Sequence, residues 1–148
     1  MDIAEALTGP VLRLHQRLYV GSDGRLGHGM LGVPTLLLRT TGRRSGSTRT
    51  NALVYARDGD DYLVVPSNGG ADQAPAWLHN LRANPDVQIQ FGRERRGGLA
   101  RIVEPSDSGY ERLWRLVNEN NRNRYEGYQR KTTRPIPVIV ITPGGSAS

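Results

Sequence analysis

Cysteine is absent from the 148 residues of the chain. This absence excludes thiolate nucleophiles, disulfides, iron–sulfur clusters and cysteine-ligated zinc. No apolar run approaches the roughly 18 residues of a membrane-spanning helix, so the sequence does not predict an integral membrane protein. The first residues also lack the basic and long apolar regions of a secretory signal. We therefore expect a cytoplasmic protein.

Lysine is almost absent. Of the 20 basic residues, 19 are arginines and Lys131 is the one lysine. Acidic residues are missing from residues 24–57, which contain six arginines. The rest of the chain carries 14 basic and 14 acidic residues, so this stretch holds the whole net charge of +6. The planar guanidinium group suits phosphate and carboxylate oxygens, which predicts an anionic partner. The alternative is a set of arginines that merely face solvent.

Residues that could perform chemistry unaided are also scarce. His15, His28 and His79 lie too far apart to form a paired-histidine motif, and we expect no metal site. The sequence has no nucleophile-elbow serine, no phosphate-binding P-loop pattern and no visible pair of catalytic carboxylates. An enzyme with this composition would depend on a bound cofactor, and the protein would supply position and electrostatics.

The length predicts a single domain over residues 1–148, with a helical extension over about residues 1–24 and a frayed tail over residues 144–148. Strands are predicted at residues 35–41, 48–57, 62–67, 87–91, 99–103 and 136–141, with a turn at residues 93–98. Helices are predicted at residues 11–18, from Pro75 to near Asn84, and after a capping box formed by Ser108 and Glu111. About six mostly antiparallel strands with three peripheral helices indicate an α+β fold whose sheet closes into a barrel.

Two glycine-rich stretches are candidates for binding an anion. Residues 42–49 (GRRSGSTR) combine two glycines, which free backbone N–H groups to face an anion, with three arginines and several hydroxyls. Residues 67–75 lead into a predicted helix, whose N-terminal dipole favours anions or a flat polar ring. The alternatives are a charged hairpin tip and an ordinary strand-to-helix connection.

Several motifs follow one another in a single register along most of the chain. They are residues 40–46 (TTGRRSG) with Arg49 and Asn51, residues 67–71 (SNGGA), residues 75–85 (PAWLHNLRANP) and residues 125–129 (YEGYQ). Residues 24–27 (GRLG) and 134–138 (RPIPV) also fit. Together, over about residues 10–143, they resemble the deazaflavin-dependent nitroreductase family.

The resemblance implies a split β-barrel of the FMN-binding-like type that binds coenzyme F420, an 8-hydroxy-5-deazaflavin with a lactyl phosphate and a polyglutamate tail. The anionic tail agrees with the charge argument made above. Its reduced form would pass hydride to quinones, nitroaromatics or activated enones. The residues implied to hold the phosphate and tail, to line the ring or to close its edge are Arg43, Arg44, Ser45, Arg49, Thr50, Asn51, Leu53, Val54, Val65, Pro66, Ser67, Asn68, Ala76, Trp77 and Asn80.

Tyr125 and Tyr128 are the implied catalytic residues. They are the only large rings in the polar stretch 118–134, and we expect this stretch to be mobile and to cover the acceptor. A phenol with a pKa near 10 would donate a hydrogen bond or a proton to the acceptor oxygen. The alternative is ordinary packing of two rings three residues apart.

Three positions depart from the family pattern. Asn68 and Arg44 stand where similar sequences can carry lysine, and Arg122 stands where an additional tyrosine can occur. We therefore expect the acceptor side to differ from that of nitroimidazole-reducing relatives.

Two other functions fit parts of the sequence. One is an oxidoreductase that binds FMN on the same barrel. The other is a nucleic-acid-binding module, suggested by a pI near 10.3 and arginine-rich turns. Because no recognised nucleic-acid motif is present, we expect a small-molecule acceptor and no nucleic-acid partner. Peripheral membrane contact through Arg13 and Arg17 of the first helix is an accessory alternative. The sequence does not determine the oligomeric state, for which a homodimer is one alternative.

Overall fold

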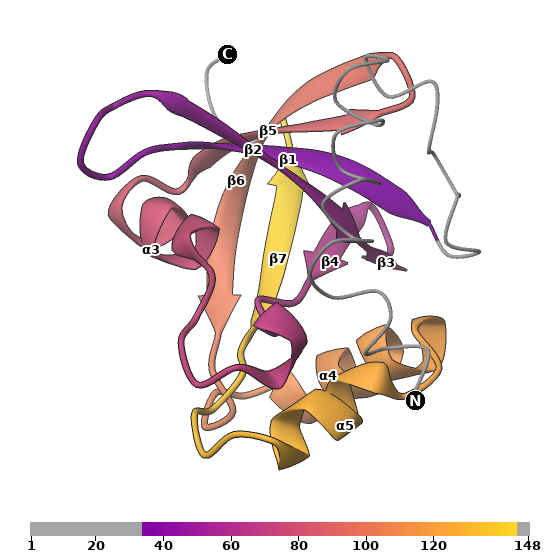
Figure 1. Ribbon diagram of the computed structural model, residues 1–148. Helices are drawn as coiled ribbons and strands as arrows, with labels where there is room; N and C mark the ends of the chain where they lie inside the picture. Colours follow the sequence, from indigo (N-terminus) through magenta and orange to yellow (C-terminus); the bar gives the residue numbers. More distant parts are fainter. Residues whose placement is uncertain (1–33, 145–148) are drawn as a thin grey trace.

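The computed structural model describes residues 34–144, which form one curved antiparallel sheet and three α-helices (Figure 1). The strands are β1 (Thr35–Thr41), β2 (Thr48–Val54), β3 (Ala56–Asp58), β4 (Asp61–Val64), β5 (Asp86–Phe91), β6 (Glu94–Val103) and β7 (Val138–Pro143). The helices are α3 (Ala76–Ala83), α4 (Tyr110–Asn120), α5 (Arg124–Arg130) and the short 3-10 helix η1 (Asn68–Gly70). The sheet order is β2-β1-β5-β6-β7-β4-β3, and the sheet curls into a half-barrel. The predicted α+β class is confirmed.

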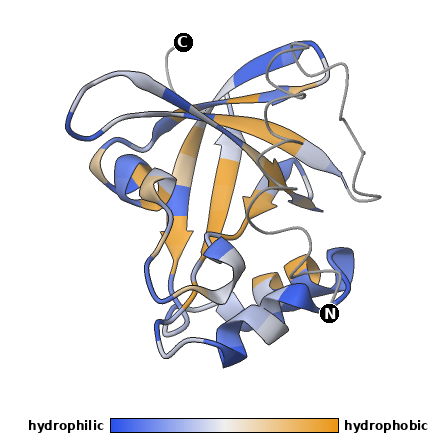
Figure 2. Cartoon of the chain, in the orientation of Figure 1, coloured by the Kyte–Doolittle hydropathy of each residue, from blue (hydrophilic) through white to orange (hydrophobic). Residues whose placement is uncertain are grey.

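The last strand along the chain, β7, lies in the middle of the sheet, paired with β6 and β4. Successive side chains of a strand point to opposite faces. Val138 and Val140 accordingly enter one hydrophobic core, and Ile139 and Ile141 enter the other. Figure 2 shows hydrophobic residues concentrated on these central strands. A strand buried on both faces has to be apolar throughout, which explains the sequence VIVI.

The core that contains Ile139 and Ile141, called the first core from here on, is covered by α3. Trp77, Leu78 and Leu81 of this helix pack with Leu36 and Leu38 of β1. The helix begins directly after Pro75 and ends before Asn84-Pro85, as predicted, because a residue that precedes proline avoids the α region. The core therefore fixes α3 beside β1.

The second core lies on the other face of the sheet, under α4 and α5. Tyr110 of α4 is buried there and donates a hydrogen bond of 2.6 Å to the carbonyl oxygen of Ile136. Burial raises the pKa of this phenol above its ordinary value. Leu113 and Val117 complete the buried face of α4 and pack toward β4 and β7.

The prediction of a single strand over residues 48–57 is wrong, because Tyr55 divides this stretch into two strands. Its first part, β2, pairs with β1, whereas its second part, β3, pairs with β4. The backbone N–H of Tyr55 donates to the carbonyl oxygen of Pro34, which directly precedes β1. The pairing of β2 with β1 stops at Val54 and Thr35, and the residues after Tyr55 pair with β4 instead. Because β2 and β3 are the two outer strands of the sheet, this single residue joins its edges.

Two other predicted features are corrected. The hairpin turn between β5 and β6 consists of Gly92 and Arg93, and not of residues 93–98, because Glu94 already pairs with Phe91. Gly92 has φ +56°, which suits a tight hairpin turn. The expected capping box does not form, since Gly109 (φ +87°) precedes α4 with no side-chain cap.

Two strand predictions are also shifted. The strand expected at residues 62–67 is β4 and ends at Val64, and the strand expected at residues 136–141 is β7 and begins at Val138. Residues 34–144 contain seven strands where about six were predicted, mainly because of the break at Tyr55. The helix predicted at residues 11–18 and most of the predicted tail lie outside the described residues. No helix in the described part of the chain has the length and apolar character needed to cross a membrane.

Candidate functional site

The turn between β1 and β2 is compact and internally hydrogen-bonded. The N–H of Gly42 donates to the carbonyl oxygen of Ser47 (2.7 Å), and the N–H of Gly46 donates to that of Gly42 (2.8 Å). The N–H of Ser47 donates to Oγ of Ser45 (3.1 Å). A methyl group at Gly42 would lie 2.8 Å from Oγ of Ser45, and Gly46 has φ +73°. The positive φ favours glycine at position 46, and a methyl group at Gly42 would also crowd the carbonyl oxygen of Ser47 (3.1 Å).

Asn80 of α3 fastens the helix to this turn. Its side chain is buried, with 6% exposed, and its Oδ1 accepts a hydrogen bond of 3.1 Å from the backbone N–H of Arg43. Its Nδ2 donates to Oγ1 of Thr40 (3.3 Å). The backbone N–H groups of residues 42, 43, 46 and 47 thus have partners within the protein. The expectation that glycine-freed N–H groups face an anion is wrong at these positions.

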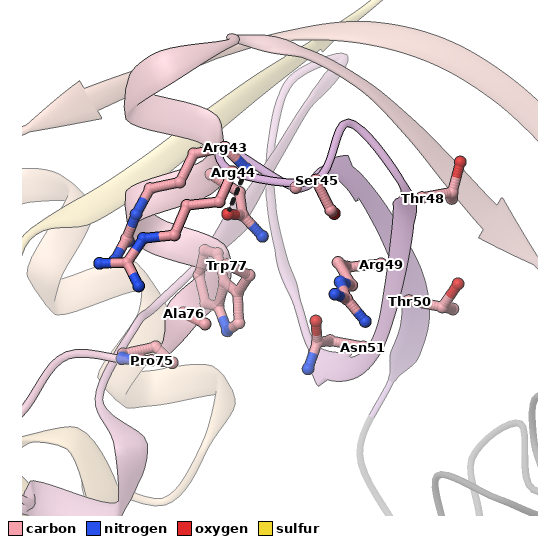
Figure 3. A pocket seen from close by; sticks show the side chains of 12 residues that line it. Arg43, Arg44, Ser45, Thr48, Arg49, Thr50, Asn51, Pro75, Ala76 and Trp77 are labelled. Atoms are coloured by element: carbon pink, nitrogen blue, oxygen red, sulfur yellow. Dashed lines mark hydrogen bonds between the residues drawn. The ribbon is translucent and has the colours of Figure 1, made fainter.

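A cleft of about 610 Å³ lies between this turn, β2 and the start of α3. It is lined by Gly42, Arg43, Arg44, Ser45, Thr48, Arg49, Thr50, Asn51, Pro75, Ala76, Trp77 and Asn80. Figure 3 shows the side chains of Arg43 and Arg44 along one side of the cleft, while Arg49 and Asn51 point into it from β2. Thr48 and Thr50 point to the other side of β2, as strand alternation requires.

The electrostatics of the cleft are one-sided. Arg43, Arg44 and Arg49 are exposed, and no acidic residue is among the described residues that line the cleft. His79, next to Asn80 on α3, has its pKa lowered from the ordinary 6.5 by partial desolvation and by the charges of Arg43 and Arg82. A surface of one charge sign raises the local concentration of anions.

Nine of the fifteen residues predicted to bind the cofactor line this cleft: Arg43, Arg44, Ser45, Arg49, Thr50, Asn51, Ala76, Trp77 and Asn80. The other six, Leu53, Val54, Val65, Pro66, Ser67 and Asn68, lie outside its lining. Leu53 packs against the first core and Val65 belongs to the second. Gly42, Thr48 and Pro75 also line the cleft. They were not among the fifteen named residues, but they lie in the two stretches predicted to bind an anion.

Tyr125 and Tyr128 lie on α5 and do not line the cleft. Both side chains are buried in the second core, with 6% and 9% exposed, and their ring centroids are 6.3 Å apart in an edge-to-face arrangement. Burial raises the pKa of Tyr125, so this phenol stays protonated in the neutral range. The stretch expected to be mobile over these tyrosines contains a helix with a buried face. A role of the hydroxyls at an acceptor stays a prediction.

The half-barrel with an arginine-lined cleft places the chain among the split-barrel proteins. A solved pyridoxamine 5'-phosphate oxidase-like protein from Listeria innocua shares this fold, with a TM-score of 0.52 and 18% identity over 74% of this chain and 83% of that one. The sequence model of the F420H(2)-dependent quinone reductases matches residues 11–143. The chain belongs to this family.

Individual relatives agree with this assignment. An F420H(2)-dependent quinone reductase of Mycobacterium tuberculosis is 53% identical over 147 residues, which cover 96% of this chain and 99% of that protein. A solved F420-H2-dependent reductase of the FDR-A type has a TM-score of 0.64 and 36% identity over 73% of this chain and 93% of its own. The predictions of the split barrel, of a reductase, of reduced F420 as cofactor and of a quinone acceptor are confirmed.

Proposed function

We propose that the cleft between the β1–β2 turn and α3 holds coenzyme F420 for the reduction of a quinone. The observation that carries the proposal is the convergence of Arg43, Arg44 and Arg49 on a cleft whose lining, within residues 34–144, contains no acidic residue. Guanidinium groups match the phosphate and carboxylate oxygens of the cofactor tail. A volume of about 610 Å³ is also typical of small-molecule and cofactor sites. The residues present therefore fit the group.

Each wall of the cleft would have its own task. Arg43 and Arg44 would hold the anionic tail from one side, and Arg49 from the other. Ser45 adds a hydroxyl at the turn. Trp77 lines the cleft but is buried, with 4% of its surface exposed, so it adds a fixed apolar edge to the wall. Asn51 points inward from β2 and can hydrogen-bond a polar ring edge.

When bound in its reduced form, the cofactor supplies a hydride to the acceptor. The chain binds and orients the reactants and excludes water beside Trp77. In this proposal, Tyr125 and Tyr128 keep a protonated phenol for the acceptor oxygen as it gains negative charge. Leu53, Val54 and residues 65–68 would line the ring where it extends beyond the cleft. Nitroaromatics and activated enones are proposed as further acceptors, because they accept hydride at an electron-poor centre.

We also propose where the enzyme is located and how it assembles. A cytoplasmic location, with peripheral membrane contact through residues 11–18, would bring the enzyme to apolar quinones. A homodimer is the proposed assembly. One solved structure, 32% identical with a TM-score of 0.67, is described as a domain-swapped dimer.

A side-by-side titration tests the proposed site. The purified protein is titrated with coenzyme F420 and with FMN, and binding is followed by the quenching of cofactor fluorescence. We expect tighter binding of F420, and an affinity that falls with added salt, because the longer anionic tail meets three arginines. The matched variant Arg101→Ala removes an exposed arginine of β6 outside the cleft and should bind like the wild type. Equal or tighter binding of FMN would contradict the proposal.

A further inference from the structure

The side chain of Arg134, which comes much later in the sequence, holds the loop that leads into α3. The guanidinium group of Arg134 donates to the backbone carbonyl oxygens of Pro66 (3.3 Å), Ser67 (3.0 Å) and Ala71 (3.1 Å from Nη2 and 3.3 Å from Nε). Four donor contacts from one group thus span the start and the end of η1. Partial desolvation lowers the pKa of Arg134, as expected for a guanidinium that has left bulk water.

The backbone of Arg134 is held by hydrogen bonds at both its N–H and its carbonyl group. Its N–H donates to Oγ1 of Thr132 (3.1 Å), and its carbonyl oxygen accepts from Nε2 of Gln129 (2.8 Å). Oγ1 of Thr132 in turn donates to Oδ1 of Asp72 (2.8 Å), which lies just after η1. The loop is therefore tied to the segment that follows α5 by two separate side chains.

The packing of the loop leaves little room for an alternative position. Gly70 has φ +86°, and a methyl group built on it would lie 2.8 Å from the carbonyl oxygen of Tyr128. The backbone of the loop therefore lies directly on α5. Three residues after Asp72 the chain reaches Pro75, Ala76 and Trp77, which line the cleft. Any displacement of the loop is transmitted to this wall, because the connection is short.

We infer that Arg134 is a positioning residue of the cofactor cleft, which sets the N-terminal end of α3 by holding the carbonyl groups of the η1 loop. The inference rests on the proposed cofactor site. A purely stabilising role of Arg134 would leave the surroundings of Trp77 unchanged in the folded protein, whereas the inferred role requires them to depend on Arg134. Lysine cannot replace it, because an ammonium group is a compact donor that does not span three carbonyl oxygens.

The test compares Arg134→Lys with Arg112→Lys. Arg112 donates two hydrogen bonds to the carboxylate of Asp58 (2.9 and 2.8 Å), and it does not line the cleft, so its replacement also removes a multiple contact of an arginine. Both variants are made in a Trp114→Phe background, which leaves Trp77 as the sole tryptophan of the chain. The emission of Trp77 is then read without any cofactor, and the dissociation constant of coenzyme F420 is measured separately.

For Arg134→Lys we expect a red-shifted, more easily quenched Trp77 emission and a dissociation constant raised about tenfold, since a preorganised wall is lost. Arg112→Lys should keep the parental emission and an affinity within about twofold. Parental emission and affinity in a folded Arg134→Lys protein would overturn the inference.

A milder variant covers the case in which Arg134→Lys does not fold. Thr132→Val keeps the shape of the side chain but removes the hydroxyl that links Asp72 to Arg134. A shift of the Trp77 emission in this variant supports the inference, and unchanged emission and affinity overturn it. If the parental protein does not bind F420 at all, the proposed site fails, while the emission of Trp77 still decides the role of Arg134.

Discussion

The side-chain oxygen Oδ1 of Asn80 accepts a hydrogen bond of 3.1 Å from the backbone N–H of Arg43, a residue 37 positions earlier in the sequence. This bond joins the two walls of the cleft, because Arg43 belongs to the β1–β2 turn and Asn80 to α3. Asn80 is buried, so its amide cannot exchange this partner for water at no cost. The position of the arginines thus depends on a residue that bears no charge.

Replacement of Asn80 by alanine should therefore affect both stability and binding. It leaves the N–H of Arg43 and the hydroxyl of Thr40 without their partner, which costs about 1–3 kcal/mol of unfolding free energy. Affinity for coenzyme F420 should fall as the turn loosens. Thr40→Val is the matched control, because it removes only the contact with Nδ2 and keeps the bond to Arg43. Equal loss of affinity in the two variants would contradict the role of the Arg43–Asn80 bond.

Arg49→Ala should weaken cofactor binding without destabilising the protein. A charge-assisted hydrogen bond contributes roughly 1.5–3 kcal/mol, so the dissociation constant should rise about tenfold or more. The melting temperature of the cofactor-free protein should stay close to that of the wild type, because Arg49 is exposed. Arg101→Ala makes the same change of net charge outside the cleft. A large loss of stability with unchanged affinity would show that Arg49 is structural.

His79 makes the stability of the protein depend on pH. Since its pKa is lowered in the folded state, the unfolded chain binds more protons below about pH 6.5. The associated stability is present above the ordinary pKa and is lost as the pH falls through the lower, folded pKa. Urea unfolding at about pH 5 and pH 7.5 should show a steeper loss for the wild type than for His79→Gln. Identical pH slopes would contradict this assignment.

The same histidine can report on occupation of the cleft. Inorganic phosphate beside Arg43 would offset one of the charges that lower the pKa of His79. An NMR titration of the ring, assigned with His79→Gln, should then show a higher pKa with phosphate than without it. An unchanged pKa at saturating phosphate would place the anion elsewhere.

Tyr125→Phe and Tyr128→Phe separate chemistry from packing. Each keeps the ring in the second core and removes the hydroxyl. If the hydroxyl stabilises the negative charge that develops on the acceptor, its removal should lower turnover about five- to a hundredfold. Cofactor affinity should stay within about twofold. Tyr125 should matter more. Tyr62→Phe, a buried tyrosine of β4 in the other core, is the control. Full turnover with quinones and nitroaromatics in both single variants and the double variant would reduce the two residues to packing.

Local sequence patterns predicted the elements that local chemistry controls. The bounds of β1 and the start and end of α3 follow from an apolar run and from two prolines, and both were predicted. The break at Tyr55 was not, because residues 48–57 contain neither glycine nor proline. It arises opposite the first residue of β1, where the pairing of β2 with β1 stops, and this is a property of the sheet. Likewise, residues 94–98 are charged and glycine-rich, but pairing with β5 overrides that preference.

The site was predictable to a similar extent. Glycines and arginines close together in sequence identified the β1–β2 turn and the residues around Trp77. The contact of Asn80 with Arg43 and the hold of Arg134 on Pro66, Ser67 and Ala71 were not predicted, because they join segments 37 to 68 positions apart. The burial of Tyr125 and Tyr128 on a helix was not expected for a stretch predicted to be mobile, since a short polar helix with two core-facing rings resembles a loop in sequence.

The place of β7 in the sheet has a consequence for how the chain is made. Until residues 138–143 have been synthesised, β2-β1-β5-β6 and β4-β3 have no strand between them and remain two separate pieces. Each piece would expose the edge that β7 later fills, and unpaired edges of this kind favour aggregation. The nascent protein therefore passes through its most vulnerable stage late in translation. A chain that stops before Val138 should be found in inclusion bodies or degraded, even though it contains every residue that lines the cleft.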